Sequence, residues 1–544
     1  MPKTLGKLQA GNPDSLEFAT FGFQGGLNVQ DPPQLIGDHD LQQALNGYIE
    51  PSGGFRMRNG IAKQGVTLGS AGPVINARFY QGVKNGNAVT PVTELLGQYL
   101  GYLYVIGSTS NTLIGSIGGA DAQPMTWVRL QDPDDPNFTS GLTDVIVICT
   151  GSGGPYVYDG TNLYTPSGWS DAAGALWCAV VNGILWFGGI EAYPNQIFGA
   201  GDGIIASMET LPGYRNFVLS APVSGLCAQG TGATATLVIG RNSGLSVLYG
   251  TGPSTFYLQD IPFQDGITSG RSMCCADGIV YGLGRNAYYA FDGQTIPKRL
   301  SGKVEPWILN DPFTPGYPLT QNRSLAWSCA YNNRVHLGYC SYSNTPNTIL
   351  VFDLDAKGWT VLQTTPGIAS MILLDAPTDP SPYVAVVGSS TTGQTYVWDY
   401  VPSSTIQSAL DDGVPIQAAC LSKLFWIGDP GTTKAIQRVY PSLFISGSLH
   451  ANFTLSVDYA NPVVTGIVDT VNLTSNALIW MVGYWGQEYW GGVTGFVLYG
   501  PPYSRIDFPG TQGDTFAFGI STAQASPPWI FVGCSGVYSQ RGLT

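Results

Sequence analysis

The amino-acid sequence predicts an all-β fold with minimal helix: a β-propeller of about seven blades and a β-sandwich-like platform domain. Helical periodicity is almost absent, turns recur at regular intervals between short apolar strands, and the last part of the chain has longer alternating strands. We divide the chain into an N-terminal arm with a short helix and a platform strand (1–74), the propeller (75–402) and the platform domain (403–544).

The composition is poor in charge. Of 544 residues, 44% are hydrophobic and 12% aromatic but only 11% are charged, against about a quarter charged in an average soluble domain. Either much of the surface faces other protein chains, or the chain is a Gly-, Ser- and Thr-rich β-protein that needs few charges. The net charge of -13 argues against a protein that grips nucleic acid through a basic face.

Cysteine usage indicates free thiols. The nine cysteines include no CxxC pair, and most of them stand in apolar, strand-like runs. This pattern favours buried thiols made in a reducing cytoplasm over a disulfide framework.

The arm segment contains the best helical pattern of the chain. In residues 38–49, Leu41, Leu45 and Tyr48 would share one helix face, so the spacing predicts a short helix there. Residues 1–18 lack the apolar core of a secretory signal.

No membrane span is expected. The best candidate for a span, residues 173–190, carries Asn182-Gly183 at its centre. Asn-Gly between apolar runs is typical of a two-residue type I′ turn, so we predict a buried β-hairpin.

The propeller is predicted from a recurring hairpin. Segments 177–189, 273–284 and 328–339 each place a Cys or small residue before an Asn or Asp turn, followed by an apolar strand that ends near glycine. With weaker copies, successive turns are spaced by about 40 to 55 residues, which is the range of a four-stranded blade. The predicted turns lie near Gly97, Thr143, Asn182, Thr231, Asp277, Asn332 and Thr378.

Four strands that end in aspartate give a second marker of the repeat. Radially stacked blades bury both faces of each sheet, which would account for continuous apolar strands with few charges. The alternative is a set of unrelated β-hairpins in sandwiches. The marker aspartates are Asp159, Asp292, Asp353 and Asp399.

From about Ala418 the strands lengthen and alternate, which indicates the platform domain. Phe453, Leu455, Val457 and Tyr459 would face one side of a sheet. An aromatic run follows, which is either a sandwich core or an anchor for a partner chain. Its members are Trp480, Tyr484, Trp485, Tyr489 and Trp490.

The sequence contains no constellation typical of an enzyme. His39, His336 and His450 are isolated, so a zinc site is not expected. The acidic segment 132–137 lacks the spacing of a calcium loop. No GxSxG motif is present, and the four marker aspartates are interpreted as turn residues. We predict no catalytic, cofactor or metal site.

The most unusual segment is 23–33, which has two glycines, an asparagine and a Pro-Pro pair among its eleven residues. Such a segment is an irregular, shaped arm whose backbone must find its hydrogen bonds on another surface. The apolar Phe21, Phe23, Leu27, Leu35 and Ile36 argue against a loose terminus.

The N-terminal block 22–60 resembles the opening of the tail nozzle (tail tubular protein B-like) and related virion proteins of short-tailed bacteriophages. Segments 245–293 and 421–440 continue the resemblance in the same order. The positions of the block that match are Gly25, Gly26, Leu27 and Asn28; Pro32 and Pro33; Gln42, Gln43 and Asn46; and Gly54, Arg56, Arg58 and Gly60.

The resemblance implies a structural virion protein of the phage tail, assembled in the host bacterial cytoplasm. Six copies would form a ring-shaped tube below the head-to-tail adaptor protein, with a tail fibre or tailspike as an optional partner. Genomic DNA would be retained in this lumen and ejected through it without sequence-specific binding. The assembly candidates are Gly25, Gly26, Leu27, Asn28, Pro32, Pro33, Asn46, Arg56 and Arg58.

Two alternatives stay open at this point. One is a tail-associated propeller enzyme or lectin that acts on host surface polysaccharide, for which carboxylates and tryptophans should cluster at one propeller mouth. The other is a neck or hub protein of the same virion.

Overall fold

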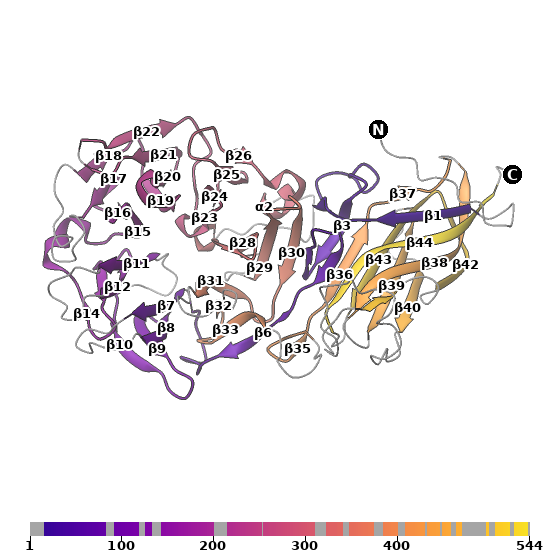
Figure 1. Cartoon of the computed structure of the whole chain (residues 1–544), viewed down its shortest axis with the longest axis horizontal. Coiled ribbons are helices and arrows are strands. Elements are labelled where there is room, and N and C mark those ends of the chain that lie inside the picture. Colours follow the sequence, from indigo (N-terminus) through magenta and orange to yellow (C-terminus); the bar gives the residue numbers. More distant parts are fainter. Residues whose placement is uncertain are drawn as a thin grey trace. The chain divides into compact units, whose positions relative to one another are not determined.

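A computed structural model describes most of the chain (Figure 1). The chain folds as two compact units. Unit 1 comprises residues 1–62, 350–365 and 399–544, and unit 2 comprises residues 63–349 and 366–398. The described residues are 16–74, 76–82, 92–118, 126–132, 143–200, 215–252, 254–309, 323–340, 347–374, 384–400, 409–429, 432–445, 449–458, 464–469, 497–499, 506–522 and 527–541.

Unit 2 has a β-propeller arrangement, in which antiparallel four-stranded sheets follow one another around a ring (Figure 1). Within five of these sheets, strands adjacent in sequence are also adjacent in space. The first three sheets are β7 (Asn76–Gly82), β8 (Val92–Tyr99), β9 (Tyr102–Ile106) and β10 (Thr112–Ser116); β11 (Thr126–Asp132), β12 (Thr143–Cys149), β13 (Tyr156–Tyr158) and β14 (Leu163–Tyr164); and β15 (Trp177–Val181), β16 (Ile184–Ile190), β17 (Tyr193–Gly199) and β18 (Asn216–Val218). The next two are β19 (Val223–Gln229), β20 (Thr236–Arg241), β21 (Gly244–Tyr249) and β22 (Tyr257–Ile261); and β23 (Cys274–Ala276), β24 (Ile279–Leu283), β25 (Tyr288–Phe291) and β26 (Lys298–Arg299).

Two further groups of strands are found in the described part of unit 2. One is the hairpin of β27 (Trp327–Tyr331) and β28 (Arg334–Tyr339), after which β29 (Thr348–Asp353) begins. The other is the antiparallel set β31 (Ile368–Leu374), β32 (Val384–Ser389) and β33 (Thr395–Tyr400). The first strands of the groups lie next to one another in the circular order β7, β11 with β12, β15, β19, β23, β27, β31 and back to β7.

The ring is closed by the segment that precedes β7. Leu68 N–H donates to Gly393 O at 2.7 Å, and Val74 N–H donates to Ser389 O at 2.9 Å. The side chain of Gln394 donates to the carbonyl of Gln64 at 3.2 Å. The start of unit 2 therefore pairs with its last sheet, so that this sheet does not present an open edge there.

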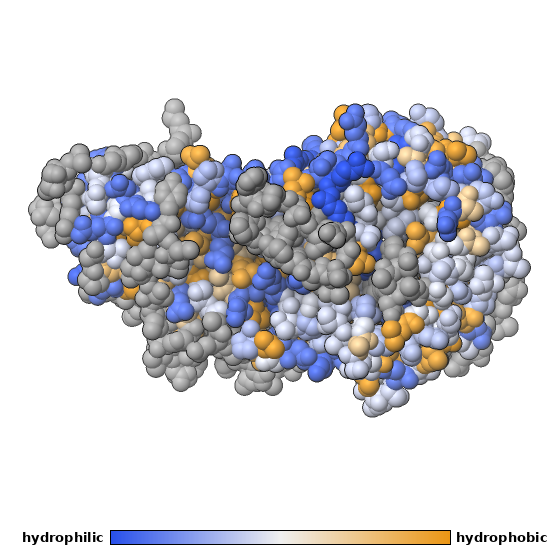
Figure 2. Space-filling view, turned by 180° about the vertical axis from the view of Figure 1, so that it is seen from behind, coloured by the Kyte–Doolittle hydropathy of each residue, from blue (hydrophilic) through white to orange (hydrophobic). Residues whose placement is uncertain are grey.

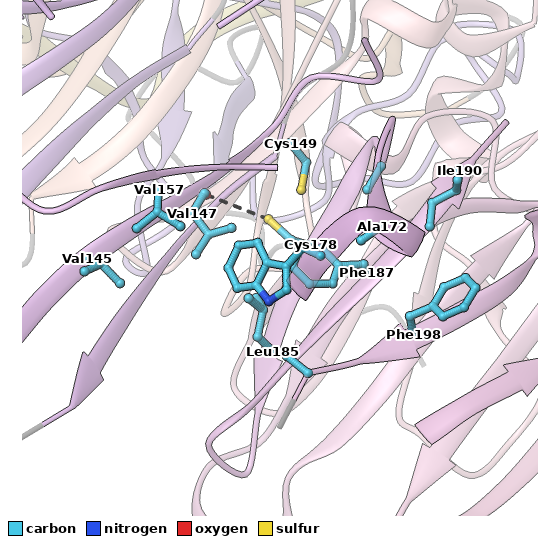
Figure 3. Close-up of a cluster of buried hydrophobic side chains, with 13 residues drawn as sticks. Val145, Val147, Cys149, Val157, Ala172, Cys178, Leu185, Phe187, Ile190 and Phe198 are labelled. Atoms are coloured by element: carbon cyan, nitrogen blue, oxygen red, sulfur yellow. Dashed lines mark hydrogen bonds between the residues drawn. The ribbon is translucent and has the colours of Figure 1, made fainter. Parts of the chain in front are cut away.

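Both faces of an inner blade strand such as β12 are buried, as the sequence predicts, whereas outermost strands such as β22 and β26 are largely exposed. Val145, Val147 and Cys149 on β12 pack against β15 and β16, and Figure 3 shows this cluster. The intervening Ile146 and Ile148 pack against β8 and β9 on the opposite side. One apolar strand thus contributes to two cores, which accounts for apolar runs without polar alternation.

The local turn chemistry of the hairpins is confirmed at three positions. Asn182, Asp277 and Asn332 have φ of 54°, 50° and 50°, and each is followed by a second residue with positive φ, as in a type I′ turn. The segment 173–190 is therefore a hairpin, with Val181 opposite Ile184. No helix among the described residues is long and apolar enough to cross a membrane.

The other predicted turns have different outcomes. Thr231 lies between β19 and β20, as predicted. Gly97, in contrast, lies inside β8, and the nearby turn is at Leu100-Gly101 between β8 and β9. The observed turn therefore belongs to a different hairpin of the blade. The sequence did not indicate it, because the residue with φ of 50° is Leu100 and not an Asn or Asp. Thr378 lies outside the described residues, and Thr143 is the first residue of β12.

Unit 1 is built around two groups of paired strands. They draw on the N-terminal arm, residues 350–365 and the C-terminal part of the chain. The first group contains β1 (Leu16–Phe21), β4 (Gly47–Ile49), β5 (Phe55–Met57), β38 (Thr433–Ile445), β41 (Val497–Tyr499), β42 (Ile506–Gly513) and β44 (Trp529–Arg541). The second contains β30 (Trp359–Gln363), β2 (Gly26–Leu27), β3 (Asp40–Leu45), β36 (Ala418–Ser422), β37 (Phe425–Trp426), β39 (His450–Val457), β40 (Val464–Asp469) and β43 (Thr515–Thr522). Outside these groups, β6 (Gly60–Gln64) pairs with β34 (Leu410–Asp411), which pairs with β35 (Val414–Pro415).

The core of unit 1 is rich in phenylalanine. The predicted alternation on β39 is confirmed where its residues are described, because Phe453, Leu455 and Val457 are all buried. The ring of Phe453 lies 6.3 Å from those of Phe508 and Phe531, which belong to the other group of strands. Side chains of the two groups therefore meet in one core. Tyr459 and the predicted aromatic run 480–490 lie outside the described residues.

The predicted helix over residues 38–49 is wrong. The segment forms β3 and β4, separated by Asn46 with φ of 56°. β3 pairs with β36, and a register shift between Leu41 and Gln43 inserts an extra residue. Because of this bulge, Leu41 and Ala44 are both buried although they are three residues apart. The bulge imitates helical spacing in the sequence.

Few helical residues occur among the described residues. The α-helix α2 (Glu305–Ile308) spans one turn. Short 3₁₀ segments lie between strands. They are η1 (Ser167–Ala172), η3 (Gly232–Thr234), η4 (Gly270–Ser272), η5 (Ser301–Val304) and η6 (Arg323–Leu325).

The state of the cysteines and the polarity of the surface both match what the composition predicts. All nine cysteines are free, and six of them are buried, as the sequence predicts. On the face seen in Figure 2, pale, weakly polar residues cover much of the surface of unit 2, with apolar residues scattered among them.

We expect His336 on β28 to make unit 2 sensitive to acid. Burial lowers the pKa of His336 to about 3, and the nearby positive charge of Arg334 contributes to this shift. The unfolded chain has the ordinary value of about 6.5, so in mild acid it binds a proton that the folded chain does not. The stability is present above the unfolded pKa and is lost as the pH falls toward the folded value, at about 1.4 kcal/mol per pH unit.

The measurement is thermal unfolding of the chain and of a His336→Gln variant from about pH 7 to about pH 4. The melting temperature of the variant should fall less steeply with acid. Parallel curves would show that His336 does not carry this dependence.

Candidate functional site

The N-terminal arm is anchored within unit 1. Phe23 N–H donates to Gly53 O at 2.6 Å, and Gly22 N–H donates to Val532 O at 3.1 Å. The Phe23 ring is buried and stacks on Phe531, with ring centroids 5.4 Å apart. The turn before β5 and the distant strand β44 thus satisfy the backbone of this irregular segment, and β44 also packs against its apolar residue.

Two predicted assembly glycines are required by close packing. Gly26 has φ of +65°, and a Cβ there would lie 2.5 Å from the backbone nitrogen of Trp359. At Gly25 a Cβ would lie 1.8 Å from Oδ1 of Asp40. Gly26 and Leu27 form β2, which pairs in parallel with β3. Only glycine lets the backbone approach this closely.

Asn28 holds the end of the arm. Its side-chain amide donates to Oδ2 of Asp40 at 3.0 Å, and its Oδ1 accepts from Gln30 N–H at 3.2 Å. Asp40 also accepts from Gly37 N–H at 3.1 Å. Asn28 and Asp40 are both 5% exposed, so a buried carboxylate shapes the loop from residue 28 to residue 40.

The Pro-Pro pair lies in a turn at the surface of the arm. Pro32 is exposed and its carbonyl accepts from Leu35 N–H at 2.8 Å, while the Pro33 carbonyl accepts from Leu424 N–H at 3.1 Å. Lys423 continues the contact by an ion pair of 2.6 Å with Asp38.

Arg58 and Asn46 form the most buried polar cluster of the arm. Arg58 pairs through both terminal nitrogens with Asp411, at 2.7 Å for Nη1 to Oδ1, and its side chain is 0% exposed. It also donates to Oδ1 of Asn46 at 3.4 Å and to the carbonyl of Gln363 at 3.3 Å. The Asn46 amide donates to Gln417 O at 2.8 Å. The bidentate pair is the strong form of an ion pair.

Arg56 differs from Arg58 although it is only two residues away. Its side chain is 34% exposed and lies 3.5 Å from Glu50. Strand alternation would place both arginines on one face, but Arg58 follows the last residue of β5, and its backbone N–H donates to Asn46 O at 3.1 Å. Leaving the strand at this point brings Arg58 between Asn46 and Asp411, whereas Arg56 stays at the surface.

Sequence reasoning named both ends of some of these contacts but missed other partners. The structure brings Asn46 and Arg58 together, and it places Gly25 and Asn28 on the same Asp40. Asp40, Trp359 and Asp411 were not predicted. For Asp411 a signal existed, because an arginine that is buried with apolar neighbours requires an acid elsewhere in the chain.

The marker aspartates are used structurally. Asp159, Asp292 and Asp353 each accept two backbone N–H groups from residues two and three positions ahead, for example Thr161 to Asp159 at 2.8 Å. These contacts lower the pKa of Asp292 to about 2. Their role as turn residues is confirmed. Asp399 has φ of 54° inside β33.

Comparisons with known proteins identify no family. No family model matches the chain, and no curated protein matches it. Among solved structures, the extracellular domain of BT4673 from B. thetaiotaomicron aligns at 10% identity with a TM-score of 0.37, covering 80% of this chain. The chain spans 58% of the length of that structure.

Two other structures align with lower scores. The WD40 repeats of RRP9 align at 8% identity and a TM-score of 0.34, over 63% of this chain and 99% of theirs. A glycoside hydrolase family 43 arabinoxylan arabinofuranohydrolase from Bacillus subtilis aligns at 11% identity and a TM-score of 0.24, over 87% of this chain and 96% of its own. At these scores the alignments carry no conclusion about function.

We expect the buried Arg58–Asp411 pair to be essential for the stability of unit 1. Arg58→Met leaves a buried carboxylate without its cation and should cost about 3–5 kcal/mol. The matched control, Arg56→Met, breaks a half-exposed pair and should cost less than about 1 kcal/mol. The double variant Arg58→Met, Asp411→Leu should recover part of the loss.

Urea unfolding followed by tryptophan fluorescence measures these differences. Equal losses for Arg58→Met and Arg56→Met would contradict the role assigned to the buried pair.

Proposed function

We propose that the chain is a structural virion protein, the tail nozzle of a short-tailed phage. The observation that carries the proposal is the use made of the matching residues. Gly26, Asn46 and Arg58 hold the N-terminal block to other segments of unit 1, and Gly25 and Asn28 shape the loop inside the block around Asp40. The residues that carry the resemblance therefore also make structural contacts within unit 1.

The finer architecture belongs to the same proposal. The circular order of first strands supports about seven blades. The meeting of phenylalanines from two groups of strands supports a β-sandwich-like platform. The nozzle would be a homohexameric ring in the virion tail, below the head-to-tail adaptor protein and assembled in the host cytoplasm, with a tail fibre or tailspike as a further partner.

The proposal includes no catalytic role. A propeller enzyme that cleaves polysaccharide would need two carboxylates free to act on one bond, and three of the four marker aspartates are occupied by turn hydrogen bonds. No group of three or more metal-ligating side chains is found in the described part of the chain.

Native mass spectrometry tests the ring. Six copies of a 57.7 kDa chain would give a species of about 346 kDa, as closed cyclic symmetry requires. The ring should be present at high concentration or with the adaptor protein. A chain that stays monomeric under both conditions would overturn the hexamer and with it the nozzle.

The charge of the chain gives a second expectation. Six copies with a charge of -13 each carry -78, so the isolated ring should bind duplex DNA weakly and let it slide. DNA retention on the ring, measured across a range of salt concentrations, should be low throughout. Tight, salt-sensitive retention would contradict a lumen along which DNA slides freely.

A further inference from the structure

Two cysteines of unit 2 lie close together across the boundary between its fourth and fifth sheets. Cys227 is on β19 and Cys275 is on β23, which are the first strands of these sheets and lie next to one another. Cys275 packs against a buried apolar cluster that contains Cys227, Val238 and Val280. The two thiols therefore come from different sheets but share one packing environment.

Contacts on either side of the two cysteines fix the alignment of β19 with β23. Before the cysteines, a Cβ at Gly225 would lie 2.6 Å from the Cα of Gly270, so the two backbones touch there. After the cysteines, the side-chain amide of Gln229 donates to the carbonyl of Gly278 at 2.7 Å. Both cysteines lie between these two contacts, which hold them at the same level of the ring.

The direction of the side chains separates Cys275 from its neighbour Cys274. Successive residues of a strand point to opposite faces. The Cys274 thiol is hydrogen-bonded to Tyr288, whose hydroxyl donates to Oγ of Ser328 on β27 at 2.9 Å. Cys274 therefore faces the strands that follow the fifth sheet, whereas Cys275 faces the fourth sheet and Cys227.

The two thiols differ in their access to solvent. Cys275 is half-buried, whereas Cys227 is 9% exposed. Burial raises the pKa of the Cys227 thiol, and the nearby Cys275 contributes to this shift. Because the thiolate is the reactive form of cysteine and needs to be reached by the oxidant, Cys275 is the first thiol to react. Cys227 is placed to be the second, resolving thiol.

We propose that Cys275 is a site of reversible oxidation and that Cys227 resolves it into a disulfide between the fourth and fifth sheets. With hydrogen peroxide as the oxidant, the Cys275 thiolate attacks one oxygen, the O–O bond breaks and hydroxide leaves, which gives a sulfenic acid. The Cys227 sulfur then attacks the sulfenic sulfur, and the hydroxide that leaves takes up the Cys227 proton as water. Two thiols and one peroxide give one disulfide and two waters, and two electrons pass from sulfur to oxygen.

The disulfide would fasten two neighbouring sheets of the ring when the protein leaves a reducing compartment. This chemistry is independent of the proposed nozzle function, because both thiols belong to unit 2 of a single chain. A monomeric protein should therefore form the bond as well as a hexameric ring does.

Cys149 and Cys178 provide a comparison within the same chain. Their thiols are hydrogen-bonded to each other between β12 and β15, in the buried cluster that Figure 3 shows. They are 0% and 5% exposed, and burial raises the pKa of Cys149 well above its ordinary value. This pair should stay reduced under mild oxidation, because contact between two thiols does not suffice where the oxidant has no access.

Peptide mapping of the full chain tests the site. The protein is treated with a small excess of hydrogen peroxide, the remaining thiols are alkylated, and the unreduced digest is analysed by mass spectrometry. A cross-linked pair of peptides that contains Cys227 and Cys275 should form, lighter by two hydrogen atoms than the two separate peptides. It should disappear on reduction with dithiothreitol.

A variant separates the roles of the two thiols. In Cys227→Ala the disulfide should be lost, and Cys275 should accumulate as a sulfenic acid that dimedone traps about tenfold more than in the parent. The matched control is Cys420→Ala, which removes a buried cysteine of unit 1 and should form the disulfide as the parent does.

Three results would overturn the proposal. They are a parent chain in which Cys275 forms no bond to Cys227, a predominant disulfide between another pair such as Cys149 and Cys178 or Cys274 and Cys329, and no dimedone adduct on Cys275 in folded Cys227→Ala. Thermal unfolding shows whether the variant is folded, and the mapping of the parent chain decides even if it is not.

Discussion

The buried guanidinium of Arg58 is the constraint on which the N-terminal part of unit 1 depends. A charge with no exposed surface is tolerated only where carboxylate and carbonyl oxygens surround it. Those oxygens come from Asp411, Asn46 and Gln363, which lie far apart in the chain. The end of β5 is thereby tied to the left-handed turn at Asn46, to the end of β30 and to β34. These contacts make the irregular N-terminal segment part of the core of unit 1.

The chain continues from this cluster into the closure of the propeller. Further along the chain, the backbone of Leu68 and Val74 pairs with Gly393 and Ser389. Unit 1 is assembled from three segments of the sequence, and unit 2 from two. Neither unit is a continuous stretch of chain, so each needs contacts between residues hundreds of positions apart. Such contacts cost loop-closure entropy, and strands buried on both faces offset it.

Sequence reasoning succeeded where the structure is decided locally. The turns at Asn182, Asp277 and Asn332 follow from the tolerance of Asn, Asp and Gly for positive φ, and the aspartates after strands follow from their hydrogen bonds to the next backbone amides. It failed where a distant partner decides. The segment 38–49 has helical spacing, yet pairing with β36 and a bulge make it strand. The glycines at 25 and 26 were recognised as unusual, but their reason, the approach of Asp40 and Trp359, is not local either.

Glycine permits close packing in both units. At Gly26 the missing Cβ lets two backbones touch, and at Gly118 and Gly189 it leaves room for the side chains of Tyr156 and Trp177. A chain with 72 glycines and 11% charged residues has few ion pairs with which to select a partner. Recognition must therefore rely on shape, backbone hydrogen bonds and apolar contact, which are short-ranged and insensitive to salt. Such a surface suits the closely fitted neighbours of the proposed ring, and it offers little long-range electrostatic steering.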